Sequence, residues 1–295
     1  MSSKNALVIP TLGDFSLLSK LSKYINEQTL DDFDVVFVLA KDVDVSEFKG
    51  TMDKELDRKF TVVIQDGKGI PDAMNTILGL DFKLIILTDD DAQPSSTYVS
   101  NATEFLESND NAGMVYGKVN GIYPDSNKLW FLRMFNTLSS RKRLFGFSPR
   151  IYFNSGGLMT GGLLPSNNRI SEDYAPIGVS MAWRQRSIGN FRLRNLGKHG
   201  ILYESYISAA LWKRGLITYF SPALSVGHIN RKSLSRNNEA STEILMEMYS
   251  SPHILYDMGF DIDLKSIYRL LRLSRFLPAD IRYAITLTLA NFPKK

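Results

Sequence analysis

Strand-like and helix-like segments alternate over the first 120 residues, and this alternation constrains the fold more than any other feature of the chain. Short apolar runs, each ended by proline or polar residues, alternate with stretches whose apolar residues recur at helical spacing. Strands are expected over residues 7–9, 35–39, 61–64, 83–87 and 114–119, and helices over residues 15–25, 73–78 and 98–106. This order predicts an α/β fold with a mostly parallel central sheet, helices on both faces and ligands beyond the carboxyl ends of the strands.

An acidic triplet, residues 89–91, stands at one of these strand ends. It follows the apolar run 84–87 with only Thr88 between, and Pro94 is expected to stop the strand from continuing. Clustered carboxylates repel one another, so a cation should offset them, and hard oxygen ligands favour Mg²⁺ or Mn²⁺. The triplet therefore predicts a metal site; the alternative interpretation is a solvated acidic turn.

The composition excludes several kinds of site. The chain has 295 residues, 44% of them hydrophobic, which suits one large domain or a domain with an appended module. It has no cysteine, which excludes disulfides, zinc–thiolate sites and thiol nucleophiles. No signal peptide and no apolar run of about 20 residues is visible, so we expect a cytoplasmic protein without a spanning helix.

The two halves of the chain carry opposite charge. Residues 1–127 hold 11 Lys and Arg against 21 Asp and Glu, a net charge of −10, and residues 128–295 hold 24 against 10, a net charge of +14. A basic half indicates an anionic partner: phosphate groups, a membrane surface or nucleic acid. No recognisable motif for reading nucleic acid accompanies it, so nucleic acid is not an expected partner.

Segments of the basic half are candidates for contact with an anionic membrane. Residues 128–147 interleave aromatic side chains with arginines, including the run 141–143. Near the C-terminus, one helix face is expected to carry Lys265, Arg269, Arg272 and Arg275. These segments predict peripheral association with the inner face of the cell membrane. The alternative for each is an amphipathic helix that packs its apolar side on the domain.

Six short motifs occur in order between residues 5 and 230. The first three are Val8-Ile9-Pro10-Thr11, then Gly67-Lys68-Gly69 with Ala73-Met74-Asn75, then Asp89-Asp90-Asp91 with Pro94. The last three are Gly178-Val179-Ser180-Met181-Ala182-Trp183-Arg184 with Ile188-Gly189-Asn190-Phe191, then Tyr203-Glu204 before Gly215, then Pro222 followed by His228. In this order the motifs resemble the inverting family-2 glycosyltransferases, which have the nucleotide-sugar-binding GT-A fold.

The resemblance assigns a part of the site to most of these motifs. In that family the first motif is a nucleotide-contacting turn, the third is the metal-binding D-x-D and the fourth is an acceptor-side strand. The family has an acidic pair at the fifth motif, where this chain has Tyr203 in place of one acid and Glu204 in place of the usual aspartate base. The last motif often completes the metal or diphosphate site.

The resemblance implies a metal-dependent inverting hexosyltransferase, and it implies a role for each site residue. Glu204 would be the catalytic base, and Asp89, Asp91 and His228 would hold Mn²⁺ or Mg²⁺. A UDP- or GDP-linked sugar donor would contact Pro10, Thr11, Asp66, Lys68, Asn75, Asp89, Asp90 and Arg231. The expected acceptor is a glycan or a lipid-linked molecule.

The resemblance also divides the chain. A GT-A domain is expected over residues 1–235, with a nucleotide-binding half at 1–127 and an acceptor-binding half at 128–235. Residues 236–295 are expected to form a C-terminal extension of amphipathic helices.

Glu204 and His228 also have plain structural interpretations. An acid at a helix start complements the helix dipole, which is expected to lower the pKa of Glu204 modestly. A lone histidine is more often structural than a ligand, so both interpretations of His228 stay open. The missing acid favours a second hypothesis for the whole chain, a catalytically silent GT-A-like domain that binds a sugar nucleotide, a glycan or a lipid.

Overall fold

The computed structural model describes residues 4–120, 170–172, 176, 178–194, 196, 197, 199, 200, 202–228, 254, 255 and 257–260. The strands are β1 (Asn5–Thr11), β2 (Asp34–Leu39), β3 (Phe60–Ile64), β4 (Leu84–Thr88), β5 (Ala92–Pro94), β6 (Ala112–Asn120), β7 (Ser171–Glu172), β8 (Ser180–Arg184) and β9 (Ile217–His228). The helices are α1 (Phe15–Asn26), α2 (Val45–Glu55), α3 (Ile70–Ile77), α4 (Tyr98–Ser108), α8 (Gln185–Ile188) and α9 (Tyr203–Trp212).

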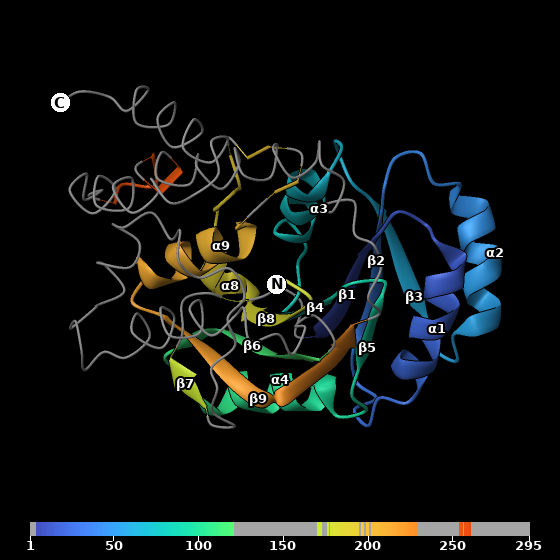
Figure 1. The fold of residues 1–295 in the computed structure, drawn as a ribbon, viewed down its shortest axis with the longest axis horizontal. Helices are drawn as coiled ribbons and strands as arrows, with labels where there is room; N and C mark the ends of the chain where they lie inside the picture. The colour runs from blue at the N-terminus through green and yellow to red at the C-terminus, as the bar shows by residue number, and fades with distance from the viewer. Residues whose placement is uncertain are drawn as a thin grey trace, which may run out of the picture.

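The described strands form one nine-stranded sheet in the order β3-β2-β1-β4-β8-β6-β9-β5, with β7 paired to β9 (Figure 1). The first four strands of this order are parallel, as the alternation along the chain predicts. Strand β8 then enters antiparallel to both β4 and β6, and β9 runs parallel to β6. The predicted α/β class is confirmed, but the sheet is mixed rather than mostly parallel because of these later strands.

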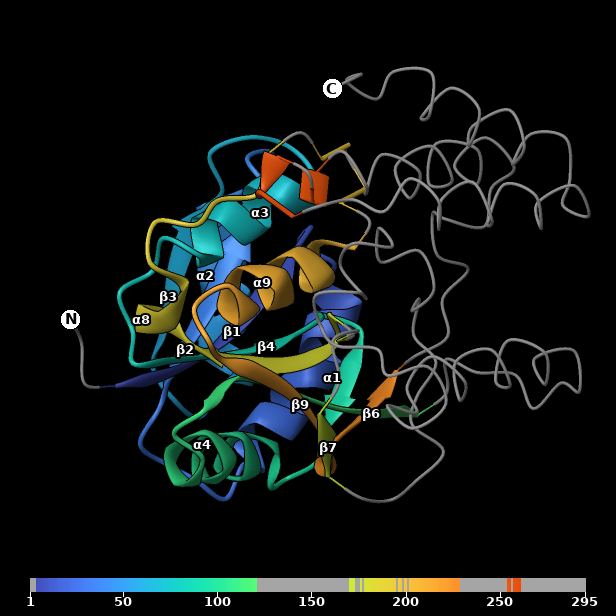
Figure 2. The ribbon, with the colours of Figure 1, turned by 90° about the vertical axis from the view of Figure 1, so that its left-hand side faces the viewer.

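Apolar residues cover both faces of the sheet, which is why its central strands read as continuous hydrophobic runs. Alternate residues of β1 point to opposite faces: Leu7 and Ile9 join a core with α1, α2 and α4, whereas Ala6 and Val8 join a core with α3, α8 and α9. Figure 2 shows α3 and α9 on one side of the sheet and α4 on the other.

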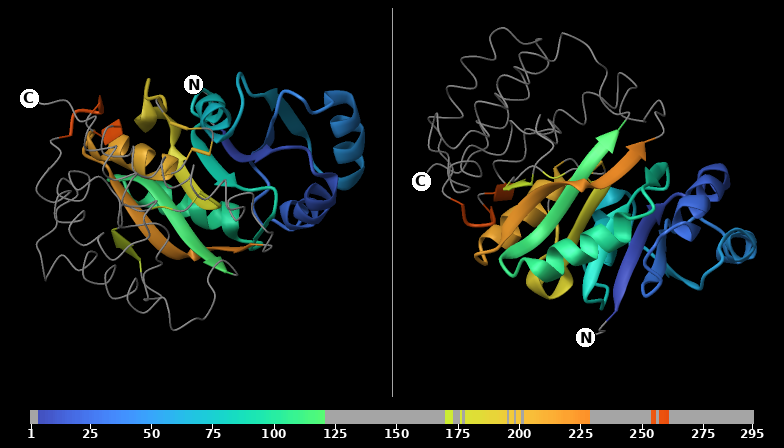
Figure 3. Two further views of the ribbon diagram at one scale, coloured as in Figure 1. Left: turned by 45° about the horizontal axis from the view of Figure 1, so that its top comes forward. Right: turned by 90° about the horizontal axis from the view of Figure 1, so that it is seen from below.

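The longest strands are β6 and β9, with 9 and 12 residues, and they run side by side in parallel (Figure 3). Their pairing carries the far end of β9 to the short strand β5, which lies antiparallel to it. This pairing matters for the site because it brings Ala92, the residue after the acidic triplet, opposite His228, which lies more than 130 positions later in the chain.

The local predictions differ from the structure at two places. Helix α2 was not expected from its apolar pattern, although Asp44 caps it by accepting hydrogen bonds from the backbone N–H groups of Ser46 and Glu47. The second place is Pro94, which was expected to stop the strand over residues 83–87. Strand β4 has already ended at Thr88. Pro94 is instead the last residue of β5, an edge strand where proline is tolerated. No helix in the described part of the chain is long and apolar enough to cross a membrane.

Candidate functional site

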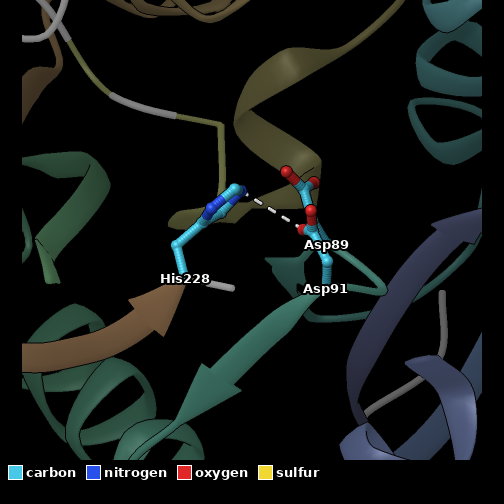
Figure 4. A group of neighbouring side chains, drawn as sticks. All are labelled: Asp89, Asp91 and His228. Carbon is cyan, nitrogen blue, oxygen red and sulfur yellow. Dashed lines mark ion pairs between the residues drawn. The ribbon is translucent and has the colours of Figure 1, made fainter. Parts of the chain in front are cut away.

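The acidic triplet lies in the short turn between β4 and β5. Strand β4 is fully buried, and the backbone N–H of Ala92 donates to the carbonyl of Asp89 at 3.2 Å, which tightens the turn. The register of β5 on β9 places Ala92 directly opposite His228. As a result the Nε2 atom of His228 lies 3.2 Å from Oδ1 of Asp91 (Figure 4).

Asp89, Asp91 and His228 form a group that fits a divalent cation. Each offers one ligand atom, and these atoms all lie within 4.8 Å of one another. All three side chains are partly buried, and the buried Nδ1 atom of His228 has no hydrogen-bond partner among the residues that the structure describes. Two carboxylates with one imidazole suit Mn²⁺, and the carboxylates alone also suit Mg²⁺. The three residues expected from the sequence to bind metal are therefore brought together.

The members of this group shift one another's pKa values. Burial, followed by the charges of Asp91 and Asp90, raises the pKa of Asp89 to about 7, while His228 acts in the opposite direction. The hydrogen bond to Asp91 in turn raises the pKa of His228. A cation bound here would compete with protons for these side chains.

Asp90 has a different partner. The hydroxyl of Thr11, at the end of β1, donates to Oδ2 of Asp90 at 2.6 Å and accepts from the backbone N–H of Gly13 at 3.0 Å. Gly13 has a φ of 83°, a conformation that favours glycine. These bonds join the acidic triplet to the turn after β1, so two of the predicted nucleotide-binding residues are in direct contact.

Glu204 lies in the first turn of α9, and its Oε1 accepts a hydrogen bond from the backbone N–H of Gly178 at 3.0 Å. Burial, with a smaller contribution from the charge of Asp89, raises the pKa of Glu204 to about 7, although hydrogen bonds from backbone N–H groups act in the opposite direction. The expected lowering by the helix dipole is therefore wrong, because the cost of burying the carboxylate exceeds what the nearby N–H groups return. Strand β8 pairs Ser180 with Thr88 of β4, so Gly178, which binds Glu204, lies at the same end of the sheet as the acidic triplet.

Close packing sets the position of this carboxylate. A Cβ atom on Gly178 would lie 2.0 Å from the hydroxyl of Tyr203 and 2.8 Å from Oε1 of Glu204, so only glycine fits there. Leu202, just before the helix, has a φ of 65° and is the only described residue other than glycine with a positive φ. Strain of this kind at a helix start is retained only where the surrounding structure enforces it.

The comparisons with known proteins agree with this geometry at the level of the fold. No family model matches the sequence, and no curated protein matches it. Among solved structures, it is similar to glucosyl-3-phosphoglycerate synthase from Mycobacterium tuberculosis in complex with Mn²⁺, uridine diphosphate and phosphoglyceric acid. That match has a TM-score of 0.53 and 13% identity, and it covers 85% of this chain and 78% of that chain.

Two further solved structures are similar. One is the mannosyltransferase PcManGT from Pyrobaculum calidifontis in complex with GDP-Man and Mn²⁺, with a TM-score of 0.54, 15% identity and coverage of 98% of this chain and 80% of that one. The other is residues 1–349 of TarS from S. aureus, with a TM-score of 0.51, 10% identity and coverage of 98% and 72%. This chain has the GT-A glycosyltransferase fold.

Three more of the predicted site residues lie at or just beyond the ends of strands β1 and β3. Pro10 precedes Thr11 in β1 and pairs with Val38 of β2. Asp66 and Lys68 are exposed in the loop between β3 and α3, where the backbone N–H of Lys68 donates to Asp72 at 2.8 Å. Their contact with a nucleotide stays a prediction, and Arg231 lies outside the described residues.

Asn75 has a structural role in the GT-A domain that the sequence did not reveal. Its side-chain amide donates to the carbonyl of Leu193 at 2.9 Å and accepts from the backbone N–H of Leu193 at 2.8 Å. These two bonds fix α3 to the segment after α8. The predicted contact of Asn75 with the donor is a separate matter that stays a prediction.

Tyr98 is a further residue that supports the site and was missed. Its buried hydroxyl donates to the carbonyl of Leu87 at 2.7 Å, two residues before the acidic triplet begins at Asp89. Burial is the main cause of its raised pKa, and the charge of Asp89 also raises it. No local signal marks this role, because an aromatic residue in an amphipathic helix is typical of any core.

Proposed function

We propose that this chain is a metal-dependent inverting glycosyltransferase that moves a hexose from a UDP- or GDP-linked donor to a hydroxyl of a glycan or lipid-linked acceptor. The observation that carries the proposal is the group of Asp89, Asp91 and His228 beyond β4, together with Glu204, which is hydrogen-bonded to Gly178 just before the strand that pairs Ser180 with Thr88. An inverting transfer needs a metal-binding group of this kind and a carboxylate base on the acceptor side. The similar proteins solved with Mn²⁺ and a nucleotide or nucleotide sugar support the donor class.

The residues of the cation-binding group would hold Mn²⁺ or Mg²⁺ through two carboxylate oxygens and one imidazole nitrogen. Bound there, the cation would offset the negative charge of the departing nucleoside diphosphate. Thr11 keeps Asp90 turned toward β1 through its 2.6 Å hydrogen bond. Pro10, Asp66, Lys68 and Arg231 complete the proposed contacts with the nucleotide.

Glu204 is the proposed general base. Its carboxylate would accept the proton of the acceptor hydroxyl while the oxygen forms a bond to the anomeric carbon, and the bond to the diphosphate breaks with its electron pair leaving on the nucleotide. The backbone N–H of Gly178 keeps one carboxylate oxygen in place. A single displacement from the opposite side gives a product of inverted anomeric configuration.

The test is Mn²⁺-dependent hydrolysis and transfer with a panel of nucleotide sugars, for the wild type and for Glu204→Gln. The proposal expects metal-dependent release of nucleoside diphosphate by the wild type, a large loss in Glu204→Gln and unchanged donor binding in both. NMR of the transferred product gives its stereochemistry independently. A retained anomer, or a fully active Glu204→Gln variant, contradicts the mechanism.

One observation favours a second function. Tyr203 stands where the resembling family has an acid, so the chain could bind a sugar nucleotide without transferring the sugar. A thermal-shift panel of nucleoside diphosphates and nucleotide sugars separates the two functions when it is paired with the hydrolysis assay. Metal-dependent stabilisation without any turnover supports the silent binding domain.

A further inference from the structure

The outer edge of β3 is unusually suited to pairing with another strand. Among the described strands β3 is the last of the sheet order and pairs only with β2. Its five residues, Phe60–Ile64, include no charge, proline or glycine, and the side chain of Ile64 is 48% exposed. Open edges of this kind are templates for strand addition, and proteins normally protect them with charge or proline.

The opposite end of the sheet order has this protection. Strand β5 has three residues and ends in Pro94, so it presents a short edge that cannot donate a hydrogen bond at its last position. Of the two ends of the sheet order, β3 therefore offers the longer edge for an added strand.

The backbone of β3 shows which groups face outward. The N–H of Gln65 donates to the carbonyl of Leu39 in β2 at 3.0 Å, so Gln65 faces inward. Because backbone groups alternate in direction along a strand, those of Phe60, Val62 and Ile64 face away from β2. The side chains of Phe60 and Val62 both pack against the core that contains α1 and α2.

We propose that the occupant is a second copy of this chain, whose β3 pairs antiparallel with β3 across a two-fold axis through Val62. In this register Val62 of one copy lies opposite Val62 of the other, and Phe60 lies opposite Ile64. All three pairs join outward-facing backbone groups, which gives about six hydrogen bonds at two per pair. Aromatic and β-branched side chains directly opposite one another also stabilise such a pair.

The flanks of this register are complementary in charge. Continuing it by two residues on each side places Arg58 of one copy opposite Asp66 of the other. Arg58 is already held near the strand by Asp31, at 3.5 Å, and by the ring of Phe33. Since the carboxyl ends of the two β3 strands point in opposite directions, the two candidate active sites lie at opposite ends of the joined sheet.

Cysteine substitution tests the register directly, because the chain has no cysteine of its own. In the proposed dimer the Cα atoms of the two Val62 residues lie about 5.5 Å apart, within the range that a disulfide spans. Val62→Cys should therefore form a covalent dimer under mild oxidation. Thr61→Cys is the matched control: its exposed side chain points to the other face, and it lies opposite Val63, so it should stay monomeric on a non-reducing gel.

A proline substitution tests the pairing without any covalent bond. Val62→Pro removes an outward N–H and leaves the inward bonds to β2, so the fold should persist while the dimer weakens by about tenfold or more in sedimentation velocity. Val62→Thr keeps the N–H and should remain dimeric. A monomeric wild type, equal cross-linking of the two cysteine variants, or a Val62→Pro dimer as strong as the wild type would overturn the proposal.

Discussion

Glu204 shows how one buried carboxylate acquires a pKa suited to proton transfer near neutral pH. Burial is the largest influence, and the N–H of Gly178 limits its effect. A base must be deprotonated before it can accept a proton, so a pKa of about 7 would leave the proposed base protonated in acid and ionised in mild base. Its environment therefore decides the pH range in which the proposed transfer can occur.

The first prediction concerns this pH dependence. The rate of transfer should rise as pH increases through about 7 and then level off, because Glu204 loses its proton in that range. Glu204→Gln should lower the plateau rate above pH 7 by roughly 10²–10⁴-fold while donor binding persists, and the difference from the wild type should shrink as pH falls. Initial rates between acid and mild base measure both effects. Glu204→Asp is the control: it keeps a carboxylate, so its rate of transfer should still rise with pH.

The second prediction concerns Asp89 and the cation. Because the pKa of Asp89 is raised to about 7, a proton competes with the metal below that pH and is absent above it. The affinity for Mn²⁺ should therefore increase with pH, by up to about tenfold per unit for each proton displaced, and flatten above neutrality. Calorimetric titration with MnCl₂ measures this. Asp91→Ala should abolish binding, whereas Asp110→Ala, at an exposed acid, should not change it.

At the scale of elements, the start of α9 and the end of β8 are held by long-range contacts. The guanidinium of Arg184, at the end of β8, is buried and donates to the carbonyls of Ala112, Leu106 and Asn109. Arg184 therefore ties β8 to the end of α4 and the start of β6. The start of α9 depends in the same way on Gly178, which lies in the turn that leads into β8.

The third prediction tests that dependence. Gly178→Ala would place a Cβ 2.0 Å from the hydroxyl of Tyr203 and 2.8 Å from Oε1 of Glu204, so these side chains or the turn that holds Gly178 must shift. A shift of about 1 Å at the base should lower the transfer rate on the order of 10²-fold, with a stability cost of about 1–3 kcal/mol. Gly50→Ala is the matched control: nothing lies within 4 Å of its added Cβ, and it should stabilise α2 by about 0.5–1 kcal/mol. The measurements are the transfer rates and the thermal unfolding of both variants. A Gly178→Ala variant with the wild-type rate contradicts the role given to Gly178.

For the whole molecule, the division of charge is the dominant property. The acidic half, residues 1–127, contains the acidic triplet between β4 and β5. The basic half contains residues 141–143 and the expected helix face from Lys265 to Arg275, and both of these segments lie outside the described residues. The division into a domain at 1–235 and an extension at 236–295 stays a prediction. So does peripheral association with the inner face of the cell membrane.

The fourth prediction is that the protein floats with anionic liposomes at low salt. Attraction between basic side chains and anionic lipid weakens with ionic strength, so flotation should fade as salt is added. Alanine substitution of residues 141–143 together with Lys265, Arg269, Arg272 and Arg275 should remove it. Liposomes of neutral lipid are the control, and a protein that stays unbound with anionic lipid at low salt disproves the association.

The sequence by itself determined the α/β class and the position of the acidic triplet, because both depend on neighbours in the chain. A short apolar run rich in isoleucine and ended by polar residues favours a buried strand, and Asp89, Asp90 and Asp91 follow this run after Thr88 alone. The sequence could also name His228 and Glu204 through the resemblance, but not their surroundings. The tertiary structure alone decided that β5 pairs with β9 and so brings His228 to Asp91. It also decided the pKa of Glu204, because burial by distant segments and contact with Gly178 outweigh the local helix dipole.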